Sequence, residues 1–330
     1  MQTRERTGQV FRSHAQFYDS DRYEMAAPKI TEQLLAGYIA EGRGFGHGEL
    51  YKAMLQLRRW NASPVSVQTH GAVPPHSRPM HFMCRSEWLL ALLFAWVGCF
   101  VREQMPMWPW RHLSPRHGLC AELDHELPWS EGTLAICKGL GIGHGTYVGT
   151  TIEYIWTLDL VLTLGWLPVA KQSCVVVSVK PLSSEEYSGD IDPLARGPEK
   201  LEVERTFAKQ LSLLYFVADR TLFPGHLLGQ LEFYANAATV PSRALSDTLA
   251  RFLDRHGPDL CQIPPIEWRD RLACEQGIGL ENADRLVQHL IWTQLVDVDL
   301  TREIDWEAVV RPGGRALIAA IRRELTKAPN

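Results

Sequence analysis

The sequence predicts a mixed α/β fold followed by a run of helices. Two stretches, 152–164 and 173–180, alternate in side-chain type with a period of two, which is typical of half-buried strands. The turn-forming residues between them, Gly165 to Pro168, predict that the two strands pair as an antiparallel hairpin. From about Pro224 onwards the pattern changes to short helices, which indicates a second, helical part.

Two helices are expected ahead of the hairpin. Thr31 is a natural N-cap for the first helix, and the glycine-rich octet Glu41–Gly48 ends it. The second helix spans Ser86–Phe100, where Ser86 is a natural N-cap and Glu87 lies in the first turn. The helix dipole favours a carboxylate at that position. Glu87 is therefore expected at the N-terminal end of a largely apolar helix.

Less regular stretches lie on both sides of the hairpin. Residues 64–79, rich in proline and glycine, predict a strand or a hairpin, whereas residues 104–149 carry no readable period and are expected to be an irregular insertion. After the hairpin, residues 181–198 are expected to form a linker. A helix over 199–211 and an apolar strand over 213–218 then complete the predicted α/β part.

The C-terminal part is predicted to be a helical, winged-helix-like module. Its helices are expected over residues 227–235, 242–255, 265–276 and 279–292. Residues 294–300 and 304–306 predict a small β-wing, whose acidic side chains favour a protein partner over DNA. The chain is thus expected to divide into a flexible N-terminal tail over residues 1–28, an α/β domain over 29–225 and a partner-binding domain over 226–330.

Composition and charge are those of an ordinary globular protein. Of the 330 residues, 45% are hydrophobic and 22% are charged. The formal net charge of -4 argues against a protein that binds nucleic acid through overall charge alone. From Lys52 to Arg85 there are five basic residues and no acidic one, so this stretch could face a phosphate backbone or form a solvated loop. Both interpretations fit the sequence.

The cysteines and the longest apolar run bear on the compartment. The seven cysteines form no CxxC pair and no zinc-binding spacing, which favours a reducing cytoplasm and no structural zinc. The apolar run Trp88–Val101 is shorter than the roughly 20 residues needed to span a bilayer, and it is expected to be a buried helix. The expectation is therefore a cytoplasmic protein that does not associate with a membrane.

The predicted hairpin has its clearest chemical consequence at Asp159 and Lys180. An antiparallel hairpin brings the start of its first strand beside the end of its second, so the carboxylate and the ammonium are expected at the same end of the sheet. Such a pair could be a simple ion pair at a sheet end. The alternative is a metal-binding acid with a neighbouring lysine, which is the working core of many metal-dependent nucleases.

Four motifs occur in the same order as in one known family. They are Glu41–Gly48 (EGRGFGHG), Ser86-Glu87 with Arg102–Pro106 (REQMP), Thr157–Leu160 (TLDL) with Ser178–Pro181 (SVKP), and Lys200–Arg205 (KLEVER) with Tyr215–Asp219 (YFVAD). Over roughly residues 30–220 the chain thereby resembles TnsA, the endonuclease subunit of the heteromeric transposases of Tn-seven-like cut-and-paste transposons. The order of all four motifs, rather than any one of them, carries the resemblance.

The resemblance implies a restriction-endonuclease-like core of the PD-(D/E)xK type and a DNA endonuclease that depends on Mg²⁺ or Mn²⁺. Glu87, Asp159 and Lys180 would be its catalytic residues. Glu87 and Asp159 would hold the metal together with the backbone carbonyl of Val179, because hard oxygen ligands suit these ions. Lys180 would orient or deprotonate the attacking water, or stabilise the charge that builds up on the phosphate.

Two further features of the motifs bear on substrate and metal binding. The glycine octet implies that Arg43, Gly44, Gly46 and His47 approach DNA phosphates, although the same glycines could simply form a helix C-cap and a loop. Two residues before the lysine the family carries an amide or an acid, whereas this chain has Ser178. Serine is a poorer metal ligand, so the binding of a second metal ion is left open.

The resemblance also implies a reaction and its partners. The chain would cut transposon-end DNA near the 5′ ends of the element, together with a DDE transposase (TnsB) that cuts the 3′ ends. An AAA+ ATPase regulator (TnsC) would contact residues 226–330. Two rival functions stay open at this point. One is a catalytically weak or inactive scaffold that bridges transposase and ATPase, and the other is a stand-alone restriction-type nuclease.

Overall fold

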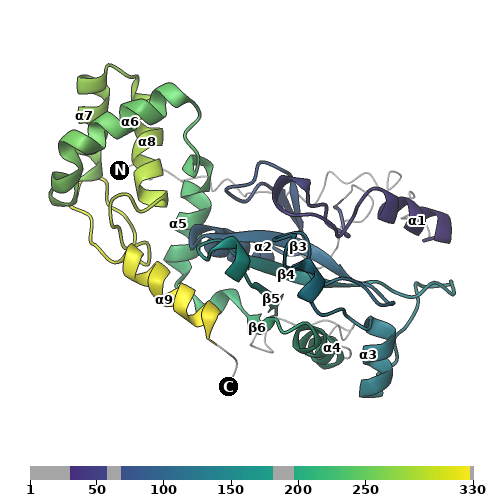
Figure 1. Cartoon of the computed structure of the whole chain (residues 1–330). Helices are drawn as coiled ribbons and strands as arrows, with labels where there is room; N and C mark the ends of the chain where they lie inside the picture. Colours follow the sequence, from purple (N-terminus) through teal and green to yellow (C-terminus); the bar gives the residue numbers. More distant parts are fainter. Residues whose placement is uncertain (1–29, 58–67, 181–196, 328–330) are drawn as a thin grey trace, which may run out of the picture.

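The computed structural model describes residues 30–57, 68–180 and 197–327, which form a four-stranded mixed sheet among helices, followed by a run of helices (Figure 1). The expected flexible tail 1–28 lies outside the described residues, as does most of the expected linker 181–198. In the part that the structure describes, no helix is long and apolar enough to cross a membrane.

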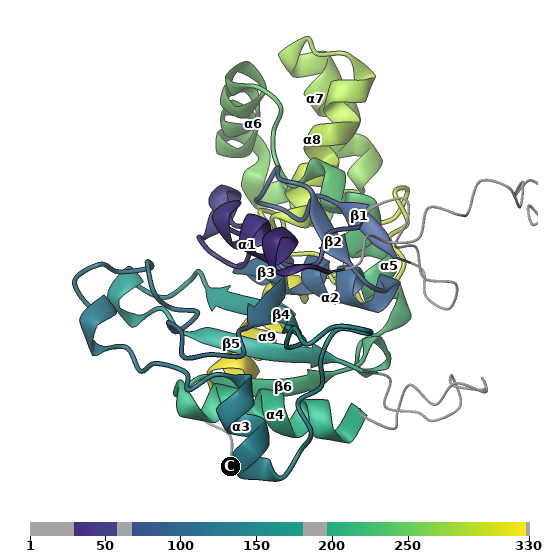
Figure 2. The same ribbon diagram turned by 90° about the vertical axis from the view of Figure 1, so that its right-hand side faces the viewer.

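The predicted hairpin is confirmed and forms the middle of the main sheet. Strands β4 (Trp156–Leu164) and β5 (Cys174–Val179) pair antiparallel. Strand β3 (Cys99–Met107) pairs antiparallel with the other side of β4, and β6 (Leu214–Ala218) pairs parallel with β5. The strand order is therefore β3-β4-β5-β6 (Figure 2).

Strand β3 is an element that the sequence did not predict. The helix expected over Ser86–Phe100 is α2 (Arg85–Trp96), which begins one residue earlier, with Cys84 as its N-cap instead of the expected serine. Gly98 follows the helix with φ +95°, a left-handed conformation that glycine adopts readily. The run Trp88–Val101 is apolar almost throughout, so its periodicity does not separate the end of a buried helix from the start of a buried strand.

Both faces of the sheet are covered, so both halves of the alternating pattern in β4 are buried. On one face α2 packs against Leu160 and the residues beside it. On the other face α4 (Gly197–Gln210) and α3 (Thr133–Leu140) pack against Val161. Because side chains alternate along a strand, Asp159 shares the face of Val161 and is enclosed between the sheet and α4.

The N-terminal elements follow the prediction closely. Helix α1 (Glu32–Ala40) begins at the expected N-cap, because Thr31 Oγ1 accepts a hydrogen bond from the Leu34 backbone N–H (3.1 Å). The stretch rich in proline and glycine contains strand β1 (Thr69–Gly71), which pairs antiparallel with β2 (Met80–Phe82) just beyond the expected bounds. The expected irregular insertion holds the last four residues of β3 and all of α3, and its remainder is loop, bends, turns and one short 3-10 helix over Asp124–Glu126.

The four predicted C-terminal helices are confirmed, the last helix (α9, Gly314–Thr326) was not predicted from the sequence, and the predicted β-wing is wrong. Residues 293–313, all of which the structure describes, contain no strand. Val296, Val298 and Leu300 alternate as the sequence indicates, but they are buried in the core from a segment of turns, and the Val298 N–H donates to Gln294 Oε1 (3.0 Å) instead of to a partner strand. The helices are α5 (Gly225–Tyr234), α6 (Arg243–His256), α7 (Pro265–Gln276), α8 (Leu280–Trp292) and α9 (Gly314–Thr326).

The C-terminal helices share a hydrophobic core with α2. Leu231 of α5 lies in the same buried cluster as Leu90 of α2. The indole N–H of Trp96, at the end of α2, donates to the backbone carbonyl of Trp292 in α8 at 2.8 Å. The domain boundary between residues 225 and 226 stays a prediction, and the core of the α/β part continues across it.

Replacing Leu231 with alanine tests this shared core. The residue is fully buried, so Leu231→Ala should lower the free energy of unfolding by about 2–5 kcal/mol. Phe233→Ala on the same helix is the matched control, because Phe233 is 60% exposed and its removal should change stability by less than about 0.5 kcal/mol. Urea denaturation followed by tryptophan fluorescence measures both. Equal small losses in the two variants would show that α5 lies outside the cooperative core.

Candidate active site

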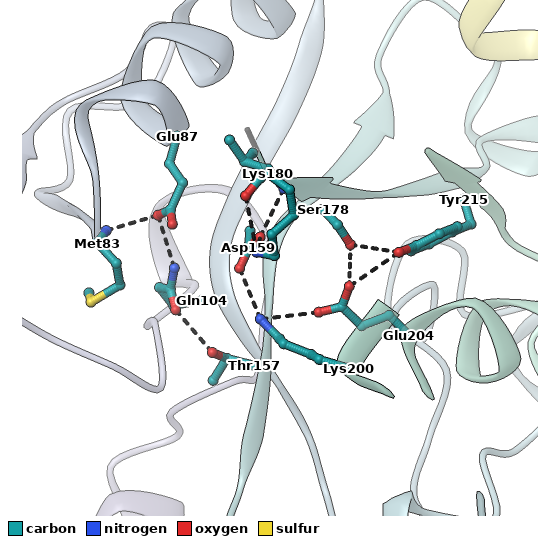
Figure 3. A network of polar contacts seen from close by, with 11 residues as sticks. Met83, Glu87, Gln104, Thr157, Asp159, Ser178, Lys180, Lys200, Glu204 and Tyr215 are labelled. Atoms are coloured by element: carbon teal, nitrogen blue, oxygen red, sulfur yellow. Dashed lines mark hydrogen bonds and ion pairs between the residues drawn. The ribbon is translucent and has the colours of Figure 1, made fainter. Parts of the chain in front are cut away.

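Asp159 is the centre of a buried polar cluster at one end of the sheet (Figure 3). Its Oδ2 accepts hydrogen bonds from the Val179 backbone N–H (2.8 Å) and from Lys180 Nζ (2.7 Å). Its Oδ1 accepts a hydrogen bond from Lys200 Nζ of α4 (3.2 Å). The hairpin thus brings Asp159 and Lys180 together as the sequence predicts, and a second lysine joins them from a helix.

Glu87 reaches the same cluster from the first turn of α2. Its Oε2 accepts hydrogen bonds from the Met83 backbone N–H (2.8 Å) and from Gln104 Nε2 (3.1 Å). Burial and the negative charge of Asp159 raise the pKa of Glu87 from its usual 4.5 to about 8, against the opposing effect of the nearby hydrogen bond and ammonium groups. Glu87 is therefore protonated at neutral pH in the metal-free protein, and it lies close enough to Asp159 to be affected by its charge.

The two carboxyl groups are held in different protonation states. Burial acts to raise the pKa of Asp159, but the charges of Lys200 and Lys180 outweigh it and lower the pKa to about 2. Burial likewise acts to lower the pKa of Lys200, and the charges of Asp159 and Glu204 raise it above its ordinary value. A neutral acid beside an ionised acid, with a charged lysine on the latter, is an arrangement typical of catalytic sites.

Gln104 is a site residue that the sequence analysis did not single out. It lies in β3, between Glu103 and Met105, with φ +48°, and its amide bridges two elements. The Nε2 donates to Glu87, while Oε1 accepts a hydrogen bond from Thr157 Oγ1 of β4 (3.0 Å). A left-handed backbone at a residue other than glycine costs about 1–3 kcal/mol, and such residues cluster at functional sites. Its only signal in the sequence is its place in the REQMP motif.

Helix α4 contributes two more residues that were not singled out. Lys200 Nζ lies 3.2 Å from Glu204 Oε1, one turn further along the helix. Ser178 Oγ hydrogen-bonds to Glu204 Oε2 and lies 3.0 Å from the Tyr215 hydroxyl of β6. The KLEVER motif contains both charged residues at a spacing of four, which puts them on one face of a helix. Only the packing of α4 on the sheet shows that this face meets Asp159.

The chemistry of the donors fits a small, hard divalent cation. Glu87, Asp159 and the Val179 carbonyl offer oxygen ligands, and Lys180 Nζ contacts two of them at once, Asp159 Oδ2 at 2.7 Å and the Val179 carbonyl at 3.0 Å. The Asp159 Oδ2 atom and the Val179 carbonyl oxygen therefore converge on one position that is favourable for a cation. Among the described residues, no group of three or more His, Cys, Asp or Glu side chains is placed to hold a metal ion. A site with two carboxylates suits Mg²⁺, which usually retains several water ligands.

The structure does not place Arg43 where a phosphate could reach it. The residue is 2% exposed, and its guanidinium lies over the Tyr38 ring, donates to Glu41 Oε2 (2.8 Å) and to the Met54 carbonyl (3.3 Å). The expected contact of Arg43 with DNA is thus corrected to a structural role in holding the octet against the loop that follows it. The periodicity of the sequence carries no information about this burial, because the octet is irregular.

Gly44, Gly46 and His47 of the octet line a cavity of about 500 Å³. Gly44 has φ +80°, and a Cβ at that position would overlap Pro106, so a glycine is required there. The ring of His47 contacts the His117 carbonyl through Nε2 (2.8 Å), and burial together with the charge of Arg102 lowers its pKa to about 4. The cavity is lined by Gly44, Gly46, His47, Arg102, Trp108 and Phe207, among others, and by no carboxylate. It lies on the same side of the sheet as α4.

The basic stretch over residues 52–85 does not form a free basic surface in its described part. The guanidinium of Arg78 donates two hydrogen bonds to the buried carboxylate of Glu103 (2.8 and 2.7 Å). Arg85 forms an ion pair with Glu232 of α5. Arg58 and Arg59, the two central arginines of this basic stretch, lie outside the described residues. In the described part, these two cations neutralise carboxylates of the protein itself.

Above about pH 7, stability should fall with rising pH because of Glu87. The folded protein holds the Glu87 proton up to about pH 8, whereas the unfolded chain releases it near 4.5, so at Glu87 the folded state binds more protons between these values. Below about pH 7 the buried histidines His47, His76, His112 and His289, whose pKa values burial lowers, act in the opposite direction. The free energy of unfolding of the metal-free protein should therefore decrease as pH rises from about 7 to 8, and Glu87 contributes the release of at most about one proton to this slope. Urea denaturation in the presence of EDTA measures this slope.

Glu87→Gln should flatten this pH profile, because the amide does not titrate. Glu202→Gln, which changes a carboxylate on the exposed side of α4, is the matched control and should keep the wild-type slope. Parallel profiles for the wild type and Glu87→Gln would show that Glu87 is already ionised in the folded protein.

Comparisons with known proteins leave the cluster to be interpreted from its own geometry. No protein-family model matches the chain, and no curated protein matches it.

Proposed function

We propose that the chain is a divalent-metal-dependent DNA endonuclease with a restriction-endonuclease-like core. The observation that carries this proposal is the convergence of Asp159, Lys180 and Glu87 from two strand ends and a helix N-terminus. A buried aspartate with a lysine at 2.7 Å and a second acid nearby is the donor set that phosphodiester hydrolysis requires. The bound metal would polarise the scissile phosphate and lower the pKa of a water molecule.

Each residue of the cluster has a separate task in this proposal. Asp159, Glu87 and the Val179 carbonyl hold the cation. Lys180, once released from Asp159, orients or deprotonates the attacking water, or stabilises the negative charge on the phosphate. Gln104 fixes the orientation of Glu87 through a hydrogen bond of 3.1 Å. With a cation bound, Glu87 would be a carboxylate and its proton would have passed to solvent, since both ionised carboxylates would then share the positive charge.

The more specific proposal is a TnsA-like subunit that cuts near the 5′ ends of a transposon. Its support is that residues of three of the four motifs meet in the cluster. They are Gln104 of REQMP, Asp159 and Lys180 of the paired TLDL and SVKP, and Lys200 of KLEVER. The substrate would be transposon-end DNA, and the partners a DDE transposase (TnsB) and an AAA+ ATPase (TnsC). The cavity lined by the glycine octet, without carboxylates, would accept part of the negatively charged strand.

The C-terminal helices are proposed to bind the ATPase partner without a β-wing. Several large apolar side chains stay exposed on this part of the chain, which is a feature of partner surfaces when they are clustered. They are Phe233, Leu280, Leu295 and Val309, with exposed fractions of 60%, 57%, 45% and 51%. Because the α2 core continues into these helices, a partner bound here would be linked mechanically to the helix that carries Glu87.

One observation favours an inactive scaffold as a second candidate. Both oxygens of Asp159 are occupied by lysines, and Ser178 replaces the usual amide or acid. A chain whose lysines hold Asp159 permanently would bind no metal and would only connect its partners. A stand-alone restriction-type nuclease is the other alternative, and cleavage of plain duplex DNA by the purified chain alone would favour it.

Substitution of the cluster residues should abolish 5′-strand cutting. In a reaction reconstituted with the transposase, the ATPase, transposon-end DNA and Mg²⁺, Asp159→Asn and Lys180→Ala should each reduce 5′ cleavage by about 10²–10⁴-fold. Lys171→Ala, at an exposed position between β4 and β5, is the control and should cut at the wild-type rate. Cleavage of the 3′ ends by the transposase in the same reaction shows that the complex has assembled. Wild-type 5′ cutting by either cluster variant would contradict the assignment.

A further inference from the structure

The cavity of about 500 Å³ beside the glycine octet has aromatic walls, formed by Phe45, Trp108, His112 and Phe207. The Phe45 ring stacks on Trp108, with ring centroids 5.9 Å apart and 21° between the planes. The His112 ring stacks on Phe207 in the same way, at 5.6 Å and 19°. Cavities of about 300–1,000 Å³ with mainly apolar and aromatic walls are typical of sites for small ligands. Walls made of flat rings favour a flat ligand.

Arg102 lines the same cavity and carries a buried charge that no carboxylate neutralises. The residue is 3% exposed, and it forms no ion pair within the described part of the chain. Its guanidinium donates to the Pro115 carbonyl (2.8 Å) and to Cys174 Sγ (3.4 Å), whereas its Nε has no partner among the described residues. Arg78, by contrast, is paired with Glu103 at 2.7 Å. A buried guanidinium without a counter-ion is unfavourable, so this cavity attracts an anionic group.

His112 adds a buried acceptor to the cavity. Its Nδ1 lies 2.8 Å from the Trp110 carbonyl, which can only accept, so Nδ1 carries the proton. Burial lowers the pKa of His112, so the ring is neutral at pH 7 and Nε2 keeps its lone pair. This Nε2 is buried and has no hydrogen-bond partner in the residues that the structure describes. The cavity therefore offers one cationic donor and one neutral acceptor besides its aromatic walls.

The cavity lies a short distance from the catalytic cluster proposed above. Phe207 follows Lys200 by seven residues in α4, which corresponds to about 10 Å along the same face of the helix. Arg102 precedes Gln104 by two residues in β3, about 7 Å along the strand. Successive nucleotides of a stacked DNA strand are about 3.4 Å apart along its axis. The cavity is therefore about two to three nucleotides away from a phosphate at the cluster.

We propose that this cavity binds one unpaired nucleotide of the DNA strand that is cut, with its base between the aromatic rings and its phosphate on Arg102. The inference rests on the proposed nuclease function and adds a substrate contact away from the metal-binding residues. A base in a duplex is covered by its neighbours, so it has to leave the stack before it can enter the cavity. His112 Nε2 then accepts a hydrogen bond from an exocyclic amino group of the base.

A nucleotide fits the cavity better than a simple anion or an apolar group does. A free phosphate would neutralise Arg102 but would leave the aromatic rings uncovered. An apolar side chain would cover the rings but would leave the buried charge uncompensated. A nucleotide brings a flat ring for the walls and one negative charge for the guanidinium. Single-stranded nucleic acids are generally bound by this combination, with cationic groups on the backbone and aromatic rings on the bases.

Binding of single-stranded DNA to the full chain in EDTA tests the inference without cleavage. The probe is a short oligothymidine strand with one 2-aminopurine, whose fluorescence falls when the base stacks on an aromatic ring. Phe45→Ala should weaken binding by about 5–100-fold and remove most of this quenching. Trp110→Ala is the matched control. Trp110 is 47% exposed, as Phe45 is, and it also stacks on Trp108, but it does not line the cavity and its variant should bind as the wild type does.

Two comparisons separate the base from the phosphate. A fully abasic strand of the same length keeps every phosphate, and an end label reports its binding through fluorescence anisotropy. The wild type should bind it about 5–100-fold more weakly than the complete strand, and Phe45→Ala should not weaken it further. Arg102→Gln should weaken both strands and reduce the slope of log affinity against log salt by about 0.7, the value for one phosphate of a single strand. A purely structural role of Arg102 would leave that slope unchanged.

Three results would overturn the nucleotide pocket. They are a wild type that does not bind the strand, equal binding by Phe45→Ala and Trp110→Ala, and equal affinity of the wild type for the complete and the abasic strand. If Phe45→Ala loses affinity for the transposase instead of for DNA, the cavity binds a protein segment and the proposal is wrong. Circular dichroism shows whether each variant folds, and the comparison of the two strands needs only the wild type.

The same experiments distinguish this inference from the proposed function. Base-dependent binding that Phe45→Ala removes, in a chain that cuts no DNA with Mg²⁺, would overturn the nuclease and leave the pocket. Cutting that Asp159→Asn abolishes, together with binding that does not depend on the base, would overturn the pocket and leave the nuclease.

Discussion

The buried charge of Asp159 is the constraint on which the rest of the cluster depends. An ionised carboxylate with 5% exposure is tolerated only when positive charge compensates it. Two lysines from different elements supply that charge, Lys180 after β5 and Lys200 in the first turn of α4. Their contacts require the end of β5 and the start of α4 to lie against the same residue of β4. Compensation of the Asp159 charge therefore requires that β4, the end of β5 and the start of α4 pack together.

A second constraint acts from the other side of the cluster, through α2. Glu87 stays protonated because it is buried close to Asp159, and Gln104 holds it in place from a strained position in β3. The helices of the C-terminal part pack on α2, and the Trp96 indole in its last turn donates a hydrogen bond to the Trp292 carbonyl of α8. The helical part thus contributes to the geometry of the cluster, although none of the cluster residues described here belongs to it.

Residues of different elements also meet at Ser178. Position 178 in β5 carries a serine, and Glu204 places a buried carboxylate beside it from α4. The strand motif alone does not reveal this carboxylate. The packing of α4 on the sheet does, because contacts between helix and strand bring together residues 26 positions apart.

Local patterns in the sequence determined the hairpin, α1, the C-terminal helices α5 to α8 and the meeting of Asp159 with Lys180. Alternation, capping residues and a short turn are local features, and a hairpin places its own ends side by side without help from the rest of the chain. The position of β3, the burial of Arg43, the absence of a wing and the roles of Gln104 and Glu204 were decided only by the tertiary structure. A continuous apolar run is compatible with a buried helix and with a buried strand. Alternating valines can likewise be buried in a segment of turns as well as in a strand. Long-range packing chooses between such alternatives, since it alone settles which backbone groups find partners and which charges are neutralised.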